Sequence, residues 1–330
     1  MRLNELQMRK IERIYSIREE APDDIFVTCG SFEDRFLGVP EKLGEISSKR
    51  FILFRFTVPN DKGDRLIKEM EELLNIDEYK NNYQQIPVEY GRSMEAILNF
   101  HNYLQNNNLF HAKDFFITID ISTFTKDLLL NLLFYLNNFL KIKKLRLLYT
   151  LPRRYASPEE GGLSYGIKKI HMPPMYWNGW SPTKDDLMII LLGYEETRAW
   201  SLIDRFNADL NWLFITSPGP KPELNSYCEE YNRGLLNEIQ PITKVPAIDP
   251  IKTSEILSNH ITKDVAEKYN IFISPLGTKP QIIGVLYFYM HYPDIPINII
   301  TTTVVEHNVP YYSWGIGNSF ESFFPVKGGV

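Results

Sequence analysis

The sequence predicts an α/β protein built from two tandem Rossmann-like halves that are related by internal duplication. Short apolar strand-like segments alternate with helical patterns along the chain, as is typical of parallel βαβ units. Residues 116–136 and 271–289 repeat one arrangement, in which an apolar strand leads through a polar turn into a long apolar helix. A length of 330 residues also suits two domains better than one. We therefore expect an N-terminal helix at 1–22, a first half at 23–182 and a second half at 183–330.

The N-terminal segment is predicted to form an amphipathic helix. Apolar residues on one helical face are Leu3, Leu6, Ile14 and Ile17. Pro22 then marks the end of the helix. Charged residues interrupt the segment throughout, so it lacks the apolar region of a secretory signal peptide.

In the first half, expected strands alternate with polar loops and helices. The expected strands are 25–29, 50–56, 115–120 and 144–150. The expected helices are one that runs through about residue 74, one at 93–106 and one that begins at 126. Residues 151–180 are rich in Pro, Gly and Tyr, and we expect them to be irregular.

The second half repeats this rhythm. The expected strands are 187–192, 211–217, 271–274 and 297–303, the last of which would be the final strand of the chain. The expected helices are 222–237, 251–268 and one with Pro280 at its first position, where the missing N–H costs nothing.

Short matches between the halves occur in the same order, and this order indicates a duplication of roughly 150 residues. The matched segments are Gly30-x-x-Glu33-x-Arg35 with Gly193-x-x-Glu196-x-Arg198, 86–88 with 245–247, 95–98 with 255–257, 164–167 with 313–316, and Gly179 with Gly328.

The first candidate site residues follow the first strand of each half. Ligands of open α/β sheets bind beyond the carboxyl ends of the strands. Arg35 and Arg198 could clamp a phosphate or carboxylate with two hydrogen bonds. The glutamates could accept hydrogen bonds from ribose or base groups. Alternatively, each Glu caps or pairs near a helix start and each Arg pairs with an acidic neighbour. The candidate ligand-binding residues here are Gly30, Glu33, Arg35, Gly193, Glu196 and Arg198.

The second set of candidates lies in the two strand–turn–helix units. Lys126 and Lys279 are the expected cations for an anionic ligand, supported by helix N-termini and hydroxyl groups. The remaining candidates of this set are Ser122, Ser274, Gly277 and Thr278. The turn is not a phosphate-binding P-loop, because the upstream Gly and the Ser or Thr after the Lys are missing. The alternative is a Gly/Pro turn with a solvated lysine.

Asp120 is the best single candidate for a catalytic base or a metal ligand, because it lies at a strand end. Its counterpart in the second half is Ile273 or Ser274, so only one half would carry this carboxylate. The alternative is that Asp120 caps the helix that follows it.

Composition excludes several other classes of protein. A net charge of −5 argues against sequence-independent wrapping of nucleic acid. Two cysteines form no disulfide framework, which fits a reducing cytoplasm, and the histidines show no metal-ligand spacing. The apolar stretches are interrupted or too short to span a bilayer, so we expect a soluble protein without a membrane partner. The aromatic segments 172–180 and 311–314 could stack a base or fill the seam between the halves.

The segment Ser274-Pro-Leu-Gly-Thr-Lys-Pro280 after a buried strand, preceded by a strand–Gly-x-x-x-x-Arg loop, resembles the ligand motif of CARF-type (CRISPR-associated Rossmann-fold) nucleotide sensors. The match falls on Gly277, Thr278 and Lys279. The resemblance implies a Rossmann-like fold whose domains pair around a two-fold axis and bind cyclic oligonucleotides across the pair. The first half departs from the motif, because 123–126 lacks the glycine.

The leading hypothesis is a sensing or regulatory protein for a nucleotide or another phosphorylated ligand. The resemblance implies a place in prokaryotic antiviral defence together with a separately encoded effector. The first alternative is an enzyme that acts on a nucleotide or phosphoester with Asp120, Arg35 and Lys126. The second is an interaction scaffold whose site is vestigial. Turnover separates the enzyme from the sensor, and ligand-induced stabilisation separates the sensor from the scaffold. The residues identify neither a cofactor nor the ligand.

Overall fold

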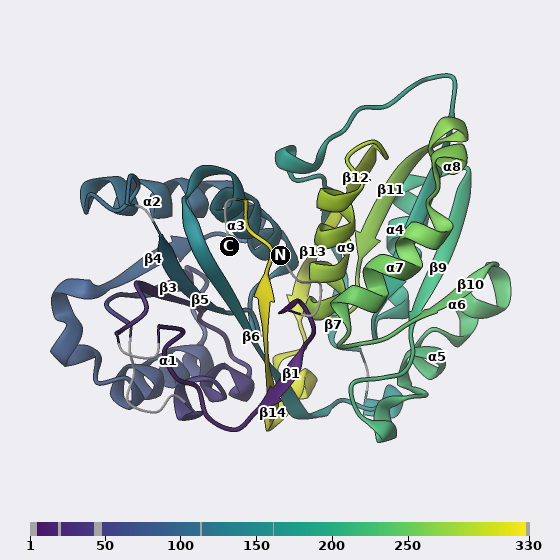
Figure 1. Cartoon of the computed structure of the whole chain (residues 1–330). Helices are drawn as coiled ribbons and strands as arrows, with labels where there is room; N and C mark the ends of the chain where they lie inside the picture. Colours follow the sequence, from purple (N-terminus) through teal and green to yellow (C-terminus); the bar gives the residue numbers. More distant parts are fainter. Residues whose placement is uncertain (1–4, 19–20, 43–47, 113, 161, 328–330) are drawn as a thin grey trace. The chain divides into compact units, whose positions relative to one another are not determined.

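The computed structural model describes residues 5–18, 21–42, 48–112, 114–160 and 162–327 and shows a mixed α/β protein (Figure 1). The chain divides into two compact units. Unit 1 comprises Met1–Tyr155 and Ser313–Val330, and unit 2 comprises Ala156–Tyr312. The boundary after Tyr155 lies earlier in the chain than the expected division at 183, and the stretch from Ser313 onward belongs to unit 1.

Unit 1 contains a seven-stranded sheet in the order β1-β14-β6-β5-β2-β3-β4. The strands from β6 to β4 are parallel, whereas β14 is antiparallel to both β6 and β1. The bounds are Arg9–Ile11 (β1), Ile25–Cys29 (β2), Phe51–Phe56 (β3), Tyr83–Val88 (β4), Phe115–Asp120 (β5), Ile142–Tyr155 (β6) and Ser313–Phe324 (β14).

Two helices of unit 1, α1 and α3, begin where the sequence supplies a capping side chain. Asn60 accepts a hydrogen bond from Gly63 N (2.8 Å) at the start of α1, and Thr125 caps α3 through Leu128 N (3.4 Å). The bounds are Asp61–Leu73 (α1), Ser93–Asn106 (α2) and Lys126–Phe139 (α3), with 3-10 helices at Asp34–Leu37 (η2), Pro40–Lys42 (η3), Ile76–Asn82 (η4) and Pro158–Glu160 (η5, in unit 2).

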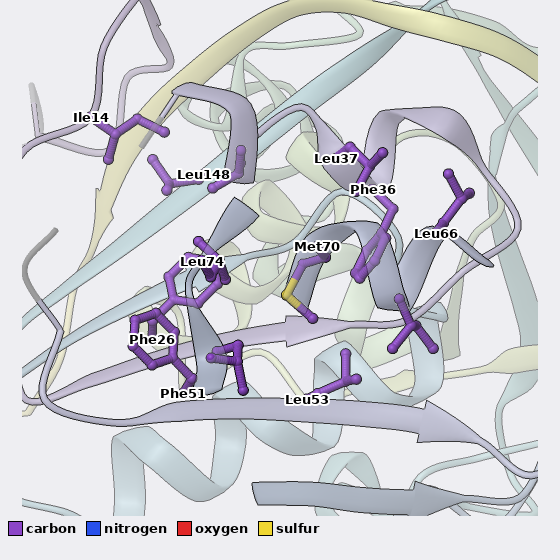
Figure 2. Packing of buried hydrophobic residues seen from close by; sticks show 13 residues of the cluster. Ile14, Phe26, Phe36, Leu37, Phe51, Leu53, Leu66, Met70, Leu74 and Leu148 are labelled. Carbon is purple, nitrogen blue, oxygen red and sulfur yellow. The ribbon is translucent and has the colours of Figure 1, made fainter. Parts of the chain in front are cut away.

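One apolar cluster anchors the loop that follows β2 (Figure 2). Phe36 and Leu37 come from this loop, and both are buried against residues of β2, β3 and α1. The cluster comprises Ile14, Phe26, Phe36, Leu37, Val39, Phe51, Leu53, Leu66, Ile67, Met70, Leu74, Ile76 and Leu148. Because burial of each large apolar side chain stabilises the fold by about 1.5–3 kcal/mol, the backbone next to Arg35 is held in place.

Unit 2 contains a parallel five-stranded sheet in the order β10-β9-β8-β11-β12, and a two-stranded antiparallel sheet of β13 and β7. The strands are Ser164–His171 (β7), Asp185–Leu192 (β8), Leu210–Thr216 (β9), Ile242–Val245 (β10), Tyr269–Pro275 (β11), Ile297–Ile299 (β12) and Thr301–His307 (β13). The helices are Glu196–Phe206 (α4), Tyr227–Tyr231 (α5), Arg233–Glu238 (α6), Pro250–His260 (α7), Lys263–Lys268 (α8) and Lys279–His291 (α9), with 3-10 helices at Pro174–Tyr176 (η6), Pro222–Leu224 (η7) and Val309–Tyr311 (η8).

Matched in chain order, the parallel strands of the units have the same arrangement, β4-β3-β2-β5-β6 and β10-β9-β8-β11-β12. Numbered along the chain within each unit, both orders read 3-2-1-4-5, as in Rossmann-like sheets. The direction in which strands are added reverses between β2 and β5 in unit 1 and between β8 and β11 in unit 2. Each unit therefore has one topological switch point, at the carboxyl ends of these strands.

In unit 1, the antiparallel strand that pairs with β6, the fifth parallel strand, comes from a distant part of the chain. β14 pairs with β6 with Ser313 opposite Tyr155, although β7 is the strand that follows β6. β7 belongs to unit 2 and pairs with β13, with Ser164 opposite His307. Both strands carry a glycine with positive φ two residues after this serine, Gly315 (66°) and Gly166 (56°).

Several expectations about elements are corrected by the structure. The N-terminal helix is wrong for the described residues 5–18, which contain β1 instead, paired to β14. Residues 151–180 are not wholly irregular, because they hold the end of β6 and all of β7. The strand near 300 is not the final one, since β14 follows it. The helix expected at 251–268 is divided into α7 and α8, and Pro280 is the second rather than the first residue of α9.

Candidate functional site

In each unit, the predicted site residues lie at the ends of the two strands that flank the switch point, or in the loop and first helical turn that follow each strand. In unit 1 these loops follow β2 and β5, and Thr123 Oγ1 donates to Cys29 O (2.6 Å), which ties them together. In unit 2 they follow β8 and β11. A Cβ added to Gly193 would lie 2.6 Å from Leu276 O, so only glycine permits this close approach of the loops. Gly30 is less constrained, because its Cβ would lie 2.9 Å from Ile67 Cδ1, the end of a side chain that can shift.

Arg35 and Glu33 form a buried ion pair in unit 1. Arg35 donates from Nε to Glu33 Oε2 and from NH2 to Glu33 Oε1, both at 2.9 Å. The two residues are only 3% and 5% exposed. Glu33 Oε2 also accepts from Ser313 Oγ (2.8 Å), and Arg35 NH1 donates to Thr150 O (3.5 Å). The acidic neighbour therefore engages Arg35, as the alternative interpretation of this motif expected.

In unit 2, the partner of Arg198 is Glu195 and not Glu196. Arg198 NH1 lies 2.9 Å from Glu195 Oε2, and Arg198 Nε and NH2 donate to Thr302 Oγ1 (2.7 Å) and Thr302 O (2.9 Å). Glu196 instead accepts from the backbone N of Leu235 (2.8 Å) near the start of α6. The equal spacing of the two motifs suggested the wrong glutamate, because unit 2 has one more residue between the acid and the arginine.

The two ion pairs have the same set of partners. Ser164 Oγ donates to Glu195 as Ser313 does to Glu33, and Thr302 O accepts from Arg198 as Thr150 O does from Arg35. Sequence reasoning did not assign a role to these hydroxyl residues. The available signal was the match of 164–167 with 313–316, which places each serine at the start of its strand.

Asp120 is fully buried at the end of β5 and is not the cap of α3, because Thr125 holds that position. Its Oδ1 accepts from both the backbone N (3.0 Å) and the Oγ of Ser122. Its Oδ2 has no hydrogen-bond partner in the described part of the chain. Burial raises the pKa of the Asp120 carboxyl to about 7, although Ser122 and the positive charge of Arg35 act in the opposite direction.

This raised pKa predicts that the protein loses stability as pH rises from about 4 to about 7. In that window the unfolded carboxyl has lost its proton while the folded one retains it, so folding is favoured at the acidic end. Asp120→Asn removes this dependence and is expected to become more stable than wild type, by a few kcal/mol, above pH 7. Denaturant unfolding of both proteins at pH 5 and pH 8 measures the change. Asp185→Asn, at an exposed position, is the control, and a pH-independent difference for Asp120→Asn would contradict the assignment.

Lys126 and Lys279 occupy equivalent positions, because each is the first residue of a helix capped by a threonine. Both lysines are partly exposed and follow the strand on the same side of the switch point. This equivalence agrees with their matching in the sequence.

The turn at Gly277 is occupied by a side chain of its own helix. Gln281 Oε1 accepts from Thr278 N (2.8 Å), and a Cβ on Gly277 would lie 1.9 Å from that oxygen. Thr278 Oγ1 accepts from Gln281 N (3.4 Å) and donates to Ala247 O. The capping box thus uses the backbone N–H groups of Thr278 and Gln281, which a bound anion would otherwise need. Lys279 is therefore the better candidate for a contact with an anion. Gln281 was missed at the sequence level, although Thr followed three residues later by Gln is a known capping signal.

The two serine candidates differ in their surroundings. Ser122 Oγ accepts from Thr150 N (2.8 Å) and donates to Asp120, so it belongs to the buried network of unit 1. Ser274 is fully buried, and its Oγ has no hydrogen-bond partner within the described residues. Neither hydroxyl is exposed to solvent.

Other properties of the described residues limit the chemistry. They contain no group of three or more His, Cys, Asp or Glu side chains able to hold a metal ion. None of their helices is both long enough and apolar enough to cross a membrane. A scan of the chain against family models found no match, and a search among curated proteins found no similar sequence.

Proposed function

We propose that the chain is a sensing or regulatory protein that binds a nucleotide or another phosphorylated ligand at the carboxyl edges of its parallel sheets. The observation that carries this proposal is the position of the switch points. In both units the strand ends, loops and first helical turns that flank the switch point contain the candidate residues, and one of these helices begins with a lysine. Ligands of open α/β sheets bind at this position, and helix N-termini favour anions.

The two ion pairs, which are buried in unit 1 and partly buried in unit 2, favour ligand binding over catalysis. Arg35 and Arg198 hold glutamates and strand carbonyls, so they stabilise the loops rather than reach a substrate. Asp120 is fully buried, whereas a general base must approach the proton that it removes. Lys126 and Lys279 supply positive charge at these edges, each at the start of a helix.

Ligand binding is tested by thermal unfolding with cyclic oligoadenylates, ATP and inorganic phosphate. A binder is expected to raise the melting temperature without being consumed. Lys126→Ala or Lys279→Ala is expected to weaken its binding by about 1–3 kcal/mol, the range for a lost charge-assisted contact.

The chain offers a matched control in Lys263→Ala. Lys263 is also the first residue of a helix capped by a threonine, but it precedes β11 and lies at the opposite edge of the sheet. Its replacement should leave affinity unchanged. If none of the ligands stabilises the protein, or if both site variants bind as wild type does, the proposal fails.

A second candidate function is catalysis on a nucleotide or phosphoester with Asp120, Arg35 and Lys126. The observation in its favour is the pKa of Asp120, since a value of about 7 suits a general base at neutral pH. Nucleotide turnover by wild type and Asp120→Asn, measured side by side, decides between the two functions. Robust wild-type turnover that disappears in the variant would replace the sensor with an enzyme.

Internal duplication and the CARF-like resemblance remain part of this proposal. The common strand order and the equivalent Glu–Arg–Ser–Thr contacts support a shared origin of the two halves. The resemblance at 277–279 supports a cyclic oligonucleotide as the first ligand to test, with a separately encoded effector in antiviral defence as the expected partner.

A further inference from the structure

Unit 2 presents two tryptophans on a loop that the proposed ligand site does not include. We call residues 177–181 the tryptophan loop. Trp177 is 51% exposed and Trp180 is 52% exposed. The loop lies between η6 and β8, and in Figure 1 the surrounding segment arches in teal past the starting ends of β11 and β12. It therefore lies at the edge of the sheet opposite to the switch point.

Two asparagines at the strand starts hold the tryptophan loop in one conformation. Asn298 Oδ1 accepts from Asn178 N (2.8 Å), and Asn298 Nδ2 donates to Gly179 O (3.0 Å). Asn270 Oδ1 accepts from Ser181 N (2.8 Å), and its Nδ2 donates to Ser181 O (2.9 Å). Both asparagines are buried. Because these hydrogen bonds already order the loop backbone, the loop would lose little conformational entropy when a partner binds the indoles.

The charged group that contacts Trp180 is a carboxylate. Trp180 Nε1 donates to Asp186 Oδ1 (2.9 Å), and Asp186 N donates to Asp209 Oδ2 (2.8 Å). Asp185, which precedes Asp186 in the chain, is exposed. Lys184, the basic residue of the same segment, donates to the backbone carbonyl of Ala266 (2.6 Å). This group of residues carries three carboxylates and one ammonium group, so its net negative charge disfavours phosphate groups and favours positively charged ones.

We propose that the tryptophan loop is a docking surface for a protein segment that presents arginine or lysine. An indole face attracts a guanidinium or ammonium group, and nearby carboxylates strengthen the attraction. Tryptophan is also among the residues that most often dominate the energy of protein interfaces. The acidic surroundings disfavour single-stranded nucleic acid, although its bases also stack on tryptophan.

The test uses the full chain and a fluorescently labelled synthetic peptide that alternates arginine with leucine. Fluorescence anisotropy measures its affinity, and a peptide of the same length that alternates glutamate with leucine is the matched probe. The arginine peptide is expected to bind more tightly. Trp177→Ala and Trp180→Ala together should weaken its binding by about 30-fold, the loss expected for a hot spot. Asp185→Lys should weaken it as well, and more strongly at low salt.

A matched variant is Leu98→Ala, which removes an apolar side chain of similar exposure (57%) from α2 in unit 1 and should leave binding unchanged. Equal binding of the two peptides, or unchanged binding by the double tryptophan variant, would overturn the proposal. Oligothymidine and neutral lipid vesicles are tested in the same way. If either binds more tightly than the arginine peptide, and the double tryptophan variant loses this binding, the loop has a different partner and the proposal is overturned. Unchanged thermal unfolding of the variants confirms that they remain folded.

Discussion

A chain that ends at residue 312 is expected to lose the native sheet of unit 1, although it retains every parallel strand of that sheet. β14 lies between β6 and β1, and it buries Phe320 and Phe324. Removal of one buried phenylalanine typically costs about 3–5 kcal/mol, so we expect the truncation to destabilise unit 1 by more than about 5 kcal/mol. It also exposes the pairing edge of β6.

Hydrogen exchange measures this effect for each unit within one sample. Amides of β5 and β6 should lose their protection in the truncated chain, while amides of β8 and β11 provide the internal reference. A synthetic peptide of residues 313–327, added in excess, should restore protection to β5 and β6, and a scrambled peptide should not. Protection of β5 and β6 that equals that of the full chain would show that unit 1 does not depend on β14.

The second large effect is expected for Arg35→Ala. The change leaves the carboxylate of Glu33 buried without its cation, and loss of one partner from a buried pair costs about 3–5 kcal/mol. Denaturant unfolding should therefore show a marked decrease in the free energy of unfolding. The same assay should show a smaller loss when Arg35→Met is combined with Glu33→Gln, since no buried charge is then left unpaired.

An exposed ion pair of the same unit is the control for Arg35. Arg55 NH2 lies 2.8 Å from Asp64 Oδ1, and the two side chains are 41% and 45% exposed. Arg55→Ala should cost only about 0–1 kcal/mol, because solvent screens this pair. If Arg35→Ala cost no more than Arg55→Ala, the buried pair would not be the element that holds the loop after β2.

Much of the parallel core could be predicted from the sequence, because strands buried on both faces are continuous apolar runs. The bounds predicted for the strands at 25–29 and 115–120 and for the helix at 93–106 agree with β2, β5 and α2. Strand partners that are far apart in the chain could not be predicted in this way. β14 and β7 pair across long separations, and local patterns carry no signal for such pairing. The N-terminal stripe of apolar residues likewise fitted a helix, but pairing of Arg9–Ile11 with β14 prevailed over the local pattern.

The positions of the candidate residues in the fold could be predicted from the sequence, but their contacts could be predicted only in part. The loops and the two lysines lie at the switch points, as expected from their positions after the strands. Distances between side chains decide the rest. Whether Arg198 pairs with Glu195 or Glu196 depends on how one extra residue is accommodated in the loop. The burial that raises the pKa of Asp120 depends on how the whole unit packs.

The position of β14 also has a consequence for synthesis on the ribosome. Tyr155 ends β6 long before Ser313 is added, and the whole of unit 2 is made in between. At about 5–20 residues per second, this interval lasts on the order of 10 s. During it, the edge of β6 that β14 later covers has no partner from β14, and an unpaired edge is a template for aggregation. The nascent chain therefore has a vulnerable period in which protection by a chaperone would matter most, and it ends only when the C-terminal strand leaves the exit tunnel.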